Sequence, residues 1–123
     1  MSIKVVDLFC GIGGLTHGFV MEDIDVVAGY DIDKTCEYPY TANNQAEFIK
    51  KDIRDVSCSE INNHFEGATV KVLVGCAPCQ PFSSYAFKSP DKEEEAKKSK
   101  WGLLYEFARL IETCMRWSGL AAH

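Results

Sequence analysis

IKVVDLFCGIGG, residues 3–14, joins a β-branched apolar run to three glycines within four positions. An apolar run of this length that ends in glycines is typical of a buried strand followed by a tight turn. Beyond the turn, Leu15, Phe19 and Val20 fall on one face of a helix that we expect to end near Glu22. Such a turn between a strand and a helix lets a ligand approach the backbone closely and places helix N-terminal amides beside it.

The rest of the sequence repeats the alternation of strand and helix. Pro39 should kink or delay the second helix, because a proline in a helix interior removes a hydrogen bond. Residues 88–100 mix lysines with acidic residues and are expected to form a mobile, solvated loop. The pattern predicts an α/β fold with a mostly parallel, doubly wound sheet, in which ligands bind beyond the carboxyl ends of the strands. We expect further strands at residues 25–30, 48–49 and 70–74, and further helices at 33–43, 61–65 (started by Ser57 or Ser59) and 103–111.

Composition limits the classes of protein to which the chain can belong. Its 123 residues correspond to one small domain or to a piece of a larger one, and no apolar run reaches the roughly 20 residues of a membrane span. The segment after Met1 lacks the pattern of a secretory signal, so we expect a cytoplasmic protein with reduced cysteines. The net charge of −5 opposes binding to DNA phosphates. Either the chain does not bind nucleic acid, or the basic surface lies elsewhere.

An acidic residue stands in register with the glycine turn. Asp31 ends the second expected strand, 17 residues after Gly14, near the position at which dinucleotide-binding folds place a carboxylate against ribose hydroxyls. The glycine spacing is G-x-G-G rather than the G-x-G-x-x-G of pyrophosphate sites, which favours a cofactor with a nucleoside but no pyrophosphate. Asp52, at a third strand end, is interpreted from its position alone as a helix cap or a solvated turn.

The segment Cys76-Ala-Pro-Cys79 admits three interpretations. It could be a redox pair, although such a pair normally opens directly into a helix after a first strand. It could be half of a zinc site, although Cys58 and His64 do not supply the usual spacing for the other ligands. The third interpretation is a nucleophilic thiol in a proline-stiffened loop at the carboxyl edge of the sheet, beside a cofactor.

Two blocks of the sequence, in this order, resemble those of the cytosine-5 DNA methyltransferases. DLFCGIGG at residues 7–14 resembles the first block of that family, and PCQPFS at 78–83 resembles its fourth and more specific block. KDIRDV at 51–56 is similar to the third block, and residues 102–109 are similar to the fifth. The resemblance covers residues 4 to about 112. It implies an incomplete Rossmann-like methyltransferase fold that takes S-adenosylmethionine as its cofactor.

The resemblance also assigns nine residues to the cofactor. It implies that the glycine turn lines the cofactor with the ring of Phe9 near the adenine, and that Asp31 holds the ribose hydroxyls. Ile32 would pack on the adenine, and Asp52 with Ile53 would recognise the adenine edge. The nine residues are Phe9, Gly11, Gly13, Gly14, Asp31, Ile32, Asp52, Ile53 and Leu103.

By the same resemblance, Cys79 is the nucleophile. In that family a cysteine thiolate adds to carbon 6 of a flipped cytosine, carbon 5 takes the methyl group, and loss of the ring proton then expels the enzyme. Pro78, Gln80 and Ser83 would shape the loop around the extruded base. The resemblance leaves Cys76 as a bystander.

Several family blocks have no counterpart in this sequence. The Glu-Asn-Val block, the arginine-bearing eighth block, the target-recognition region and the C-terminal block are absent. We therefore expect residues 1–112 to be the N-terminal portion of a methyltransferase catalytic domain and residues 113–123 to be an atypical tail. Strand 70–74 should become an exposed edge, so we expect the chain to self-associate or to pair with a complementary C-terminal methyltransferase chain.

These expectations define a leading function and three alternatives. The leading one is a fragment or subunit of a bacterial DNA (cytosine-5) methyltransferase of restriction-modification, inactive alone, which meets duplex DNA through the missing half. A related RNA methyltransferase, a non-catalytic S-adenosylmethionine-binding or assembly module, and a thiol redox protein remain open. No metal and no membrane partner are expected.

Overall fold

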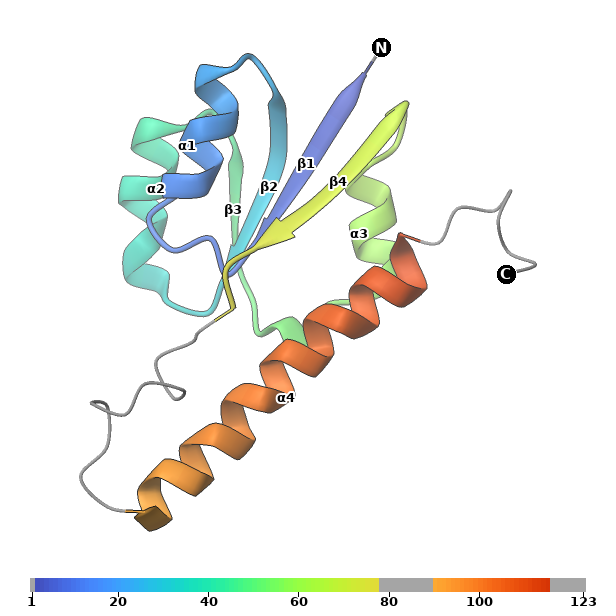
Figure 1. Cartoon of the computed structure of the whole chain (residues 1–123). Helices are drawn as coiled ribbons and strands as arrows, with labels where there is room; N and C mark the ends of the chain where they lie inside the picture. The colour runs from blue at the N-terminus through green and yellow to red at the C-terminus, as the bar shows by residue number, and fades with distance from the viewer. Residues whose placement is uncertain (1, 78–89, 116–123) are drawn as a thin grey trace.

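The computed structural model describes residues 2–77 and 90–115, with side chains for 2–77 and 102–115. Four parallel strands form one sheet in the order β3-β2-β1-β4 (Figure 1). The mostly parallel α/β sheet predicted from the sequence is therefore confirmed. The strands are β1 (Ile3–Leu8), β2 (Asp25–Asp31), β3 (Glu47–Lys50) and β4 (Val70–Gly75), and they match the four expected runs.

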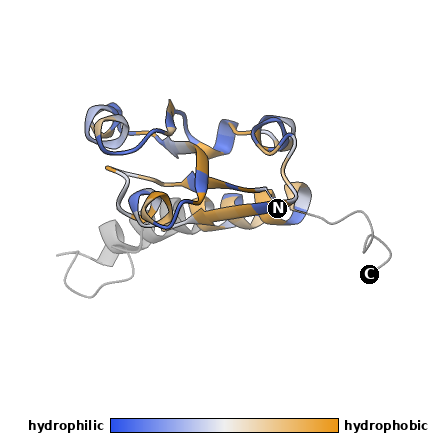
Figure 2. Ribbon diagram, turned by 90° about the horizontal axis from the view of Figure 1, so that it is seen from above, coloured by the Kyte–Doolittle hydropathy of each residue, from blue (hydrophilic) through white to orange (hydrophobic). Residues whose placement is uncertain are grey.

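Alternate side chains of the central strand enter two separate cores. Val5 of β1 packs with residues of α1 (Gly14–Met21) and α2 (Glu37–Asn43) on one face of the sheet. Val6, its neighbour, packs on the other face with residues of α3 (Cys58–His64) and α4 (Pro90–Cys114). Strands buried on both faces are expected to be apolar throughout, and the strand ribbons in Figure 2 are largely coloured hydrophobic.

Two short helices begin where capping chemistry places them. Asp33 caps a 3-10 turn, η1 (Lys34–Cys36), by accepting a hydrogen bond from the Thr35 amide, and α2 follows directly. Pro39 is the third residue of α2, within the first turn, where backbone amides lack an intrahelical partner, so it costs no hydrogen bond. The delayed start predicted for this helix is confirmed. Ser57 caps α3 by accepting from the Glu60 amide.

The expected loop at residues 88–100 is wrong for residues 90–100, which form the first turns of α4. Lysine, glutamate and alanine dominate that segment and are among the best helix formers. Pro90 occupies the first helical position, where proline is well tolerated. A helix already anchored by the apolar stripe at 103–111 can extend at little cost, because only its nucleation is expensive. Charge was therefore a poor indicator of a loop at this position.

Close packing at Gly29 yields a stability prediction. A Cβ atom at this β2 position would lie 2.4 Å from the Tyr40 hydroxyl oxygen, and Tyr40 is fully buried. We expect Gly29→Ala to lower the free energy of unfolding by about 1–3 kcal/mol, because the aromatic ring has no room to move. Urea denaturation followed by circular dichroism measures the change. Gly18→Ala, where the added carbon would meet no atom within 4 Å beyond its own stretch of helix backbone, is the matched control. Equal midpoints for the two variants would contradict the packing argument.

No helix in the described part of the chain is both long and apolar enough to cross a membrane. Residues 88–89 and 116–123, where part of the expected loop and most of the expected tail fall, lie outside the described residues.

Candidate functional site

The carboxyl ends of β1, β2 and β3 open onto a pocket of about 340 Å³. The volume lies within the range of roughly 300–1,000 Å³ typical of small-molecule sites, and its position is the one at which doubly wound sheets bind ligands. One helix, α4, contributes Leu103 to its wall. The lining residues are Leu8, Phe9, Tyr30, Asp31, Ile32, Lys51, Asp52, Ile53, Arg54, Cys76 and Leu103.

The glycine turn after β1 adjoins this pocket and has an unusual backbone. Phe9 and Gly11 both have φ of 55°, and Gly13 has φ of 94°. A positive φ at a bulky residue such as Phe9 costs about 1–3 kcal/mol and is found mainly at functional sites. At Gly13 a Cβ atom would lie 2.7 Å from both Asn44 Nδ2 and Tyr40 Cδ2, so this glycine lets the turn pack against α2.

Asp31 joins the glycine turn to the end of β2. Its Oδ2 accepts a hydrogen bond of 2.8 Å from the Gly11 amide, and its Oδ1 accepts one of 2.9 Å from the Asp33 amide. A carboxylate has about four acceptor positions, so these two bonds leave capacity for hydroxyl donors from a ligand. The side chain is thus fixed in place before any ligand arrives.

Asp52 has the capping role considered for it from the sequence, and its position also leaves it open to the pocket. It caps the 3-10 turn η2 (Ile53–Asp55) by accepting from the Arg54 amide at 2.9 Å, and it also lines the pocket. Its other oxygen lies 3.3 Å from Arg54 Nη1. Ile53 follows with 6% of its surface exposed, so its side chain joins the core as well as the pocket wall.

The structure gathers most, but not all, of the residues predicted to bind the cofactor. The three glycines of the turn do not line the pocket, and their contact with a cofactor stays a prediction. Pro78, Cys79, Gln80 and Ser83 lie outside the described residues. Six of the nine predicted cofactor residues line the pocket: Phe9, Asp31, Ile32, Asp52, Ile53 and Leu103.

Sequence reasoning missed four further lining residues with functional groups. Lys51 and Arg54 lie directly before Asp52 and after Ile53 in the sequence, so the assignment of Asp52 and Ile53 to the cofactor could have pointed to them. Tyr30 precedes Asp31, but its position in a buried strand suggested only a core residue. Cys76, interpreted as a bystander, lines the pocket with an exposed side chain. No group of three or more metal-ligating side chains occurs among the described residues.

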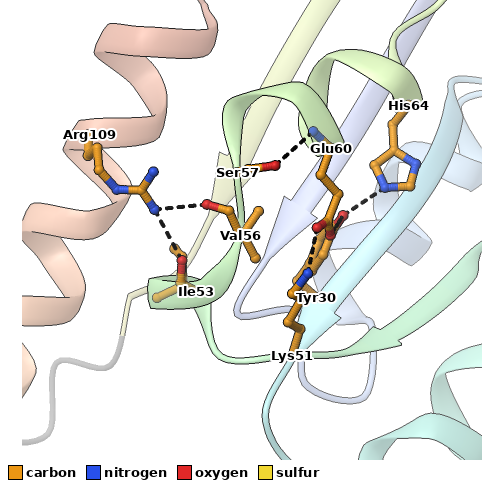
Figure 3. Close-up of polar contacts among 8 residues, drawn as sticks. All are labelled: Tyr30, Lys51, Ile53, Val56, Ser57, Glu60, His64 and Arg109. Atoms are coloured by element: carbon orange, nitrogen blue, oxygen red, sulfur yellow. Dashed lines mark hydrogen bonds and ion pairs between the residues drawn. The ribbon is translucent and has the colours of Figure 1, made fainter.

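A polar network lies beside the pocket, on the α3 side of the sheet (Figure 3). The buried Tyr30 hydroxyl donates to Glu60 Oε2 at 2.6 Å and lies 2.7 Å from His64 Nε2. Lys51, the residue after β3, donates from Nζ to Glu60 Oε1 at 2.6 Å. Glu60 therefore links α3 to the ends of two strands that line the pocket. Burial raises the pKa of Tyr30, which keeps its hydroxyl protonated as a donor.

This network predicts a pH-dependent stability. Burial raises the pKa of Glu60, but hydrogen bonds from Lys51 and Tyr30 outweigh it, and the pKa lies below its ordinary value of 4.5. Since the folded-state pKa is lowered, the stabilisation is present above pH 4.5 and is lost as the pH falls through the lowered value. We expect Glu60→Gln to cost about 1 kcal/mol at pH 7, because the pair is partly exposed and screened by solvent.

The cost of Glu60→Gln should shrink as the pH falls below 4.5 and through the lowered pKa. Urea denaturation of both proteins between pH 7 and 3.5 measures it. Glu22→Gln, at an exposed helix end, is the control and should change little at any pH. A difference between Glu60→Gln and the original chain that does not vary with pH would count against the ionised pair.

Comparisons with known proteins agree on one family. The sequence profile described as C-5 cytosine-specific DNA methylase matches residues 3–115. The type II methylase M.HgiDII of Herpetosiphon aurantiacus is 50% identical over 107 residues, which is 87% of this chain and 28% of that protein. The type II methyltransferase M.FnuDI of Fusobacterium nucleatum is 30% identical over 89% of this chain and 29% of its own length. This chain thus spans less than a third of these relatives.

A solved structure shows the same fold. The crystal structure of a candidate DNA modification methyltransferase encoded within an E. coli prophage superposes with a TM-score of 0.68 at 24% sequence identity. The match covers 93% of this chain and 30% of that one. At this level of identity the likeness supports the fold alone, and it agrees with the parallel sheet described above.

Proposed function

The chain belongs to the C-5 cytosine-specific DNA methylase family, and from this premise we propose that it is the cofactor-binding and nucleophile-bearing part of a DNA (cytosine-5) methyltransferase of the restriction-modification type. The observation that carries the proposal is the pocket at the strand ends, because Phe9, Asp52, Ile53 and Leu103, from three separate family blocks, line it together with Asp31 and Ile32. The named relatives are type II methylases, which supports the restriction-modification class.

The pocket fits S-adenosylmethionine in its chemistry. Phe9, Ile32 and Leu103 offer apolar surfaces suited to an aromatic base, and the carboxylates of Asp31 and Asp52 offer acceptors for hydroxyl and amino groups. When bound, the cofactor supplies an electrophilic methyl group. We propose that Asp31 holds the ribose hydroxyls with its free acceptor positions, while Asp52 and Ile53 recognise the adenine edge.

The nucleophile in this proposal is Cys79. Its thiolate would add to carbon 6 of a cytosine that has left the base stack, which leaves carbon 5 electron-rich and able to accept a methyl group. Pro78, Gln80 and Ser83 would form the loop around that base. Cys79 follows β4 by four residues, so the strand's carboxyl end at Gly75 sets the point from which the loop departs.

DNA binding and catalysis need surfaces beyond those described. The net charge of −5 is unfavourable for phosphate contacts, so we propose that the DNA groove is formed by a complementary C-terminal methyltransferase segment. β4 pairs with β1 on one side and ends the sheet of the described residues on the other. Its outer edge offers backbone groups with which such a segment, or a second copy of this chain, could pair.

Reconstitution tests the proposal. The chain is mixed with the C-terminal part of a type II methylase and duplex DNA, and transfer of a labelled methyl group from S-adenosylmethionine to cytosine is measured. We expect transfer only when both parts are present, and we expect sedimentation to show the chain associated rather than monomeric. Methylation of RNA instead of DNA, or cofactor binding without any transfer, would overturn the assignment.

A further inference from the structure

We propose that Arg109 is a positioning residue for adenine recognition, acting from behind the pocket on the turn that carries Asp52 and Ile53. The inference rests on the proposed function, because it concerns how the same pocket recognises its cofactor. This role is separate from the ion pair that Arg109 forms with Glu106 on the same helix.

The guanidinium of Arg109 bonds to backbone 53 and 56 residues away in the sequence (Figure 3). Its Nη2 donates to the Val56 carbonyl at 2.9 Å and to the Ile53 carbonyl at 3.3 Å. Its Nε donates to Glu106 Oε2 at 2.6 Å, which orients the guanidinium plane towards the turn. One side chain of α4 thus holds the first residue of η2 and the residue that follows it.

The position of these hydrogen bonds, next to two walls of the pocket, connects Arg109 to cofactor binding. The pocket has one wall from η2, with Asp52, Ile53 and Arg54, and another from α4, with Leu103. Arg109 follows Leu103 by six residues, about 9 Å along the helix axis, and does not line the pocket itself. The guanidinium therefore sets the position of one wall relative to the other without touching a ligand.

Arginine is suited to this task in a way that lysine is not. Its planar guanidinium presents several N–H donors in a fixed geometry, so it can bond to Glu106 and to two carbonyls at once. A lysine at position 109 would keep the charge but offers one nitrogen. Without the guanidinium, η2 keeps its own bonds, Asp55 N to Asp52 O and Val56 N to Ile53 O, and its apolar packing on α4, but loses the hydrogen bonds from Arg109.

The test separates positioning from general stability by measuring discrimination between two ligands. In S-inosylhomocysteine a carbonyl oxygen replaces the adenine amino group of S-adenosylhomocysteine and N1 carries a proton, so the edge that Asp52 and Ile53 are proposed to recognise is changed. Isothermal titration calorimetry gives the ratio of their dissociation constants for the full chain and for Arg109→Met. We expect the original chain to favour the adenosyl ligand, and we expect Arg109→Met to lower that preference by about tenfold, since one hydrogen bond to a charged group separates the ligands.

Two further variants define the outcome. Arg109→Lys should restore part of the preference, and Leu110→Val, a core change next to Arg109 that leaves the guanidinium and its hydrogen bonds in place, should lower stability but keep the preference. Hydrogen exchange at the Asp55 and Val56 amides should accelerate in Arg109→Met and stay unchanged in β1.

A preference equal in Arg109→Met and the original chain, or exchange unaltered at η2, would overturn the role of Arg109 and leave the proposed function standing. Absence of S-adenosylhomocysteine binding by the original chain would instead reject the proposed cofactor site, and with it this inference.

Discussion

Cys79→Ser should abolish the covalent adduct with 5-fluorocytosine DNA in the presence of S-adenosylmethionine, and should lower methyl transfer by on the order of 10⁴-fold or more. A serine hydroxyl is a far weaker nucleophile at neutral pH than a thiolate, so carbon 6 would not be attacked. The reconstituted pair of chains is incubated with the fluorinated duplex, and denaturing electrophoresis followed by mass spectrometry detects the adduct and its site.

Cys58→Ser is the matched control for the nucleophile. Cys58 lies on α3, where its thiol donates to the Thr113 carbonyl at 3.2 Å, a bond that a serine hydroxyl can also make. This variant should form the adduct at the original rate. Persistence of the adduct in Cys79→Ser, or thiol titration that finds Cys79 in a stable disulfide with Cys76, would reject Cys79 as the nucleophile.

Asp31→Ala should weaken binding of S-adenosylhomocysteine by about 10- to 100-fold, the equivalent of one to two hydrogen bonds to a charged group. The carboxylate is proposed to accept from the ribose hydroxyls, and it also holds the Gly11 amide at 2.8 Å. Its loss therefore removes a ligand contact and frees the glycine turn. Isothermal titration calorimetry of the chain measures the dissociation constant.

The two roles of Asp31 can be separated. Asp33→Ala removes a nearby carboxylate that caps η1 and does not line the pocket, so it should lower stability without changing affinity. Asp31→Asn keeps one oxygen that can accept from Gly11, and intermediate affinity is expected. If Asp31→Ala bound the ligand as tightly as the original chain, the ribose assignment would be wrong.

The sequence predicted the framework of the site because its signals are local. The first strand, the acid that ends the next strand and the delayed helix near Pro39 each depend on neighbours within a few positions, and the structure contains all three, with the first strand at Ile3–Leu8. Family resemblance then grouped residues such as Phe9 and Leu103, which lie at opposite ends of the chain and share one pocket. The error at residues 90–100 arose because a charged composition was weighed above helix propensity.

Periodicity, turn residues and spacing predicted where the strands and helices lie and that the acid at residue 31 ends a strand. The chain carries these signals in its linear order. The folded arrangement supplied what linear order does not contain: Tyr40 against Gly13 and Gly29, Glu60 against Lys51 and Tyr30, and Arg109 against the carbonyls of Ile53 and Val56. These contacts join residues on different elements, and Arg109 meets a carbonyl 53 positions away. Their geometry depends on how the helices pack on the sheet, and a local pattern carries no record of that packing.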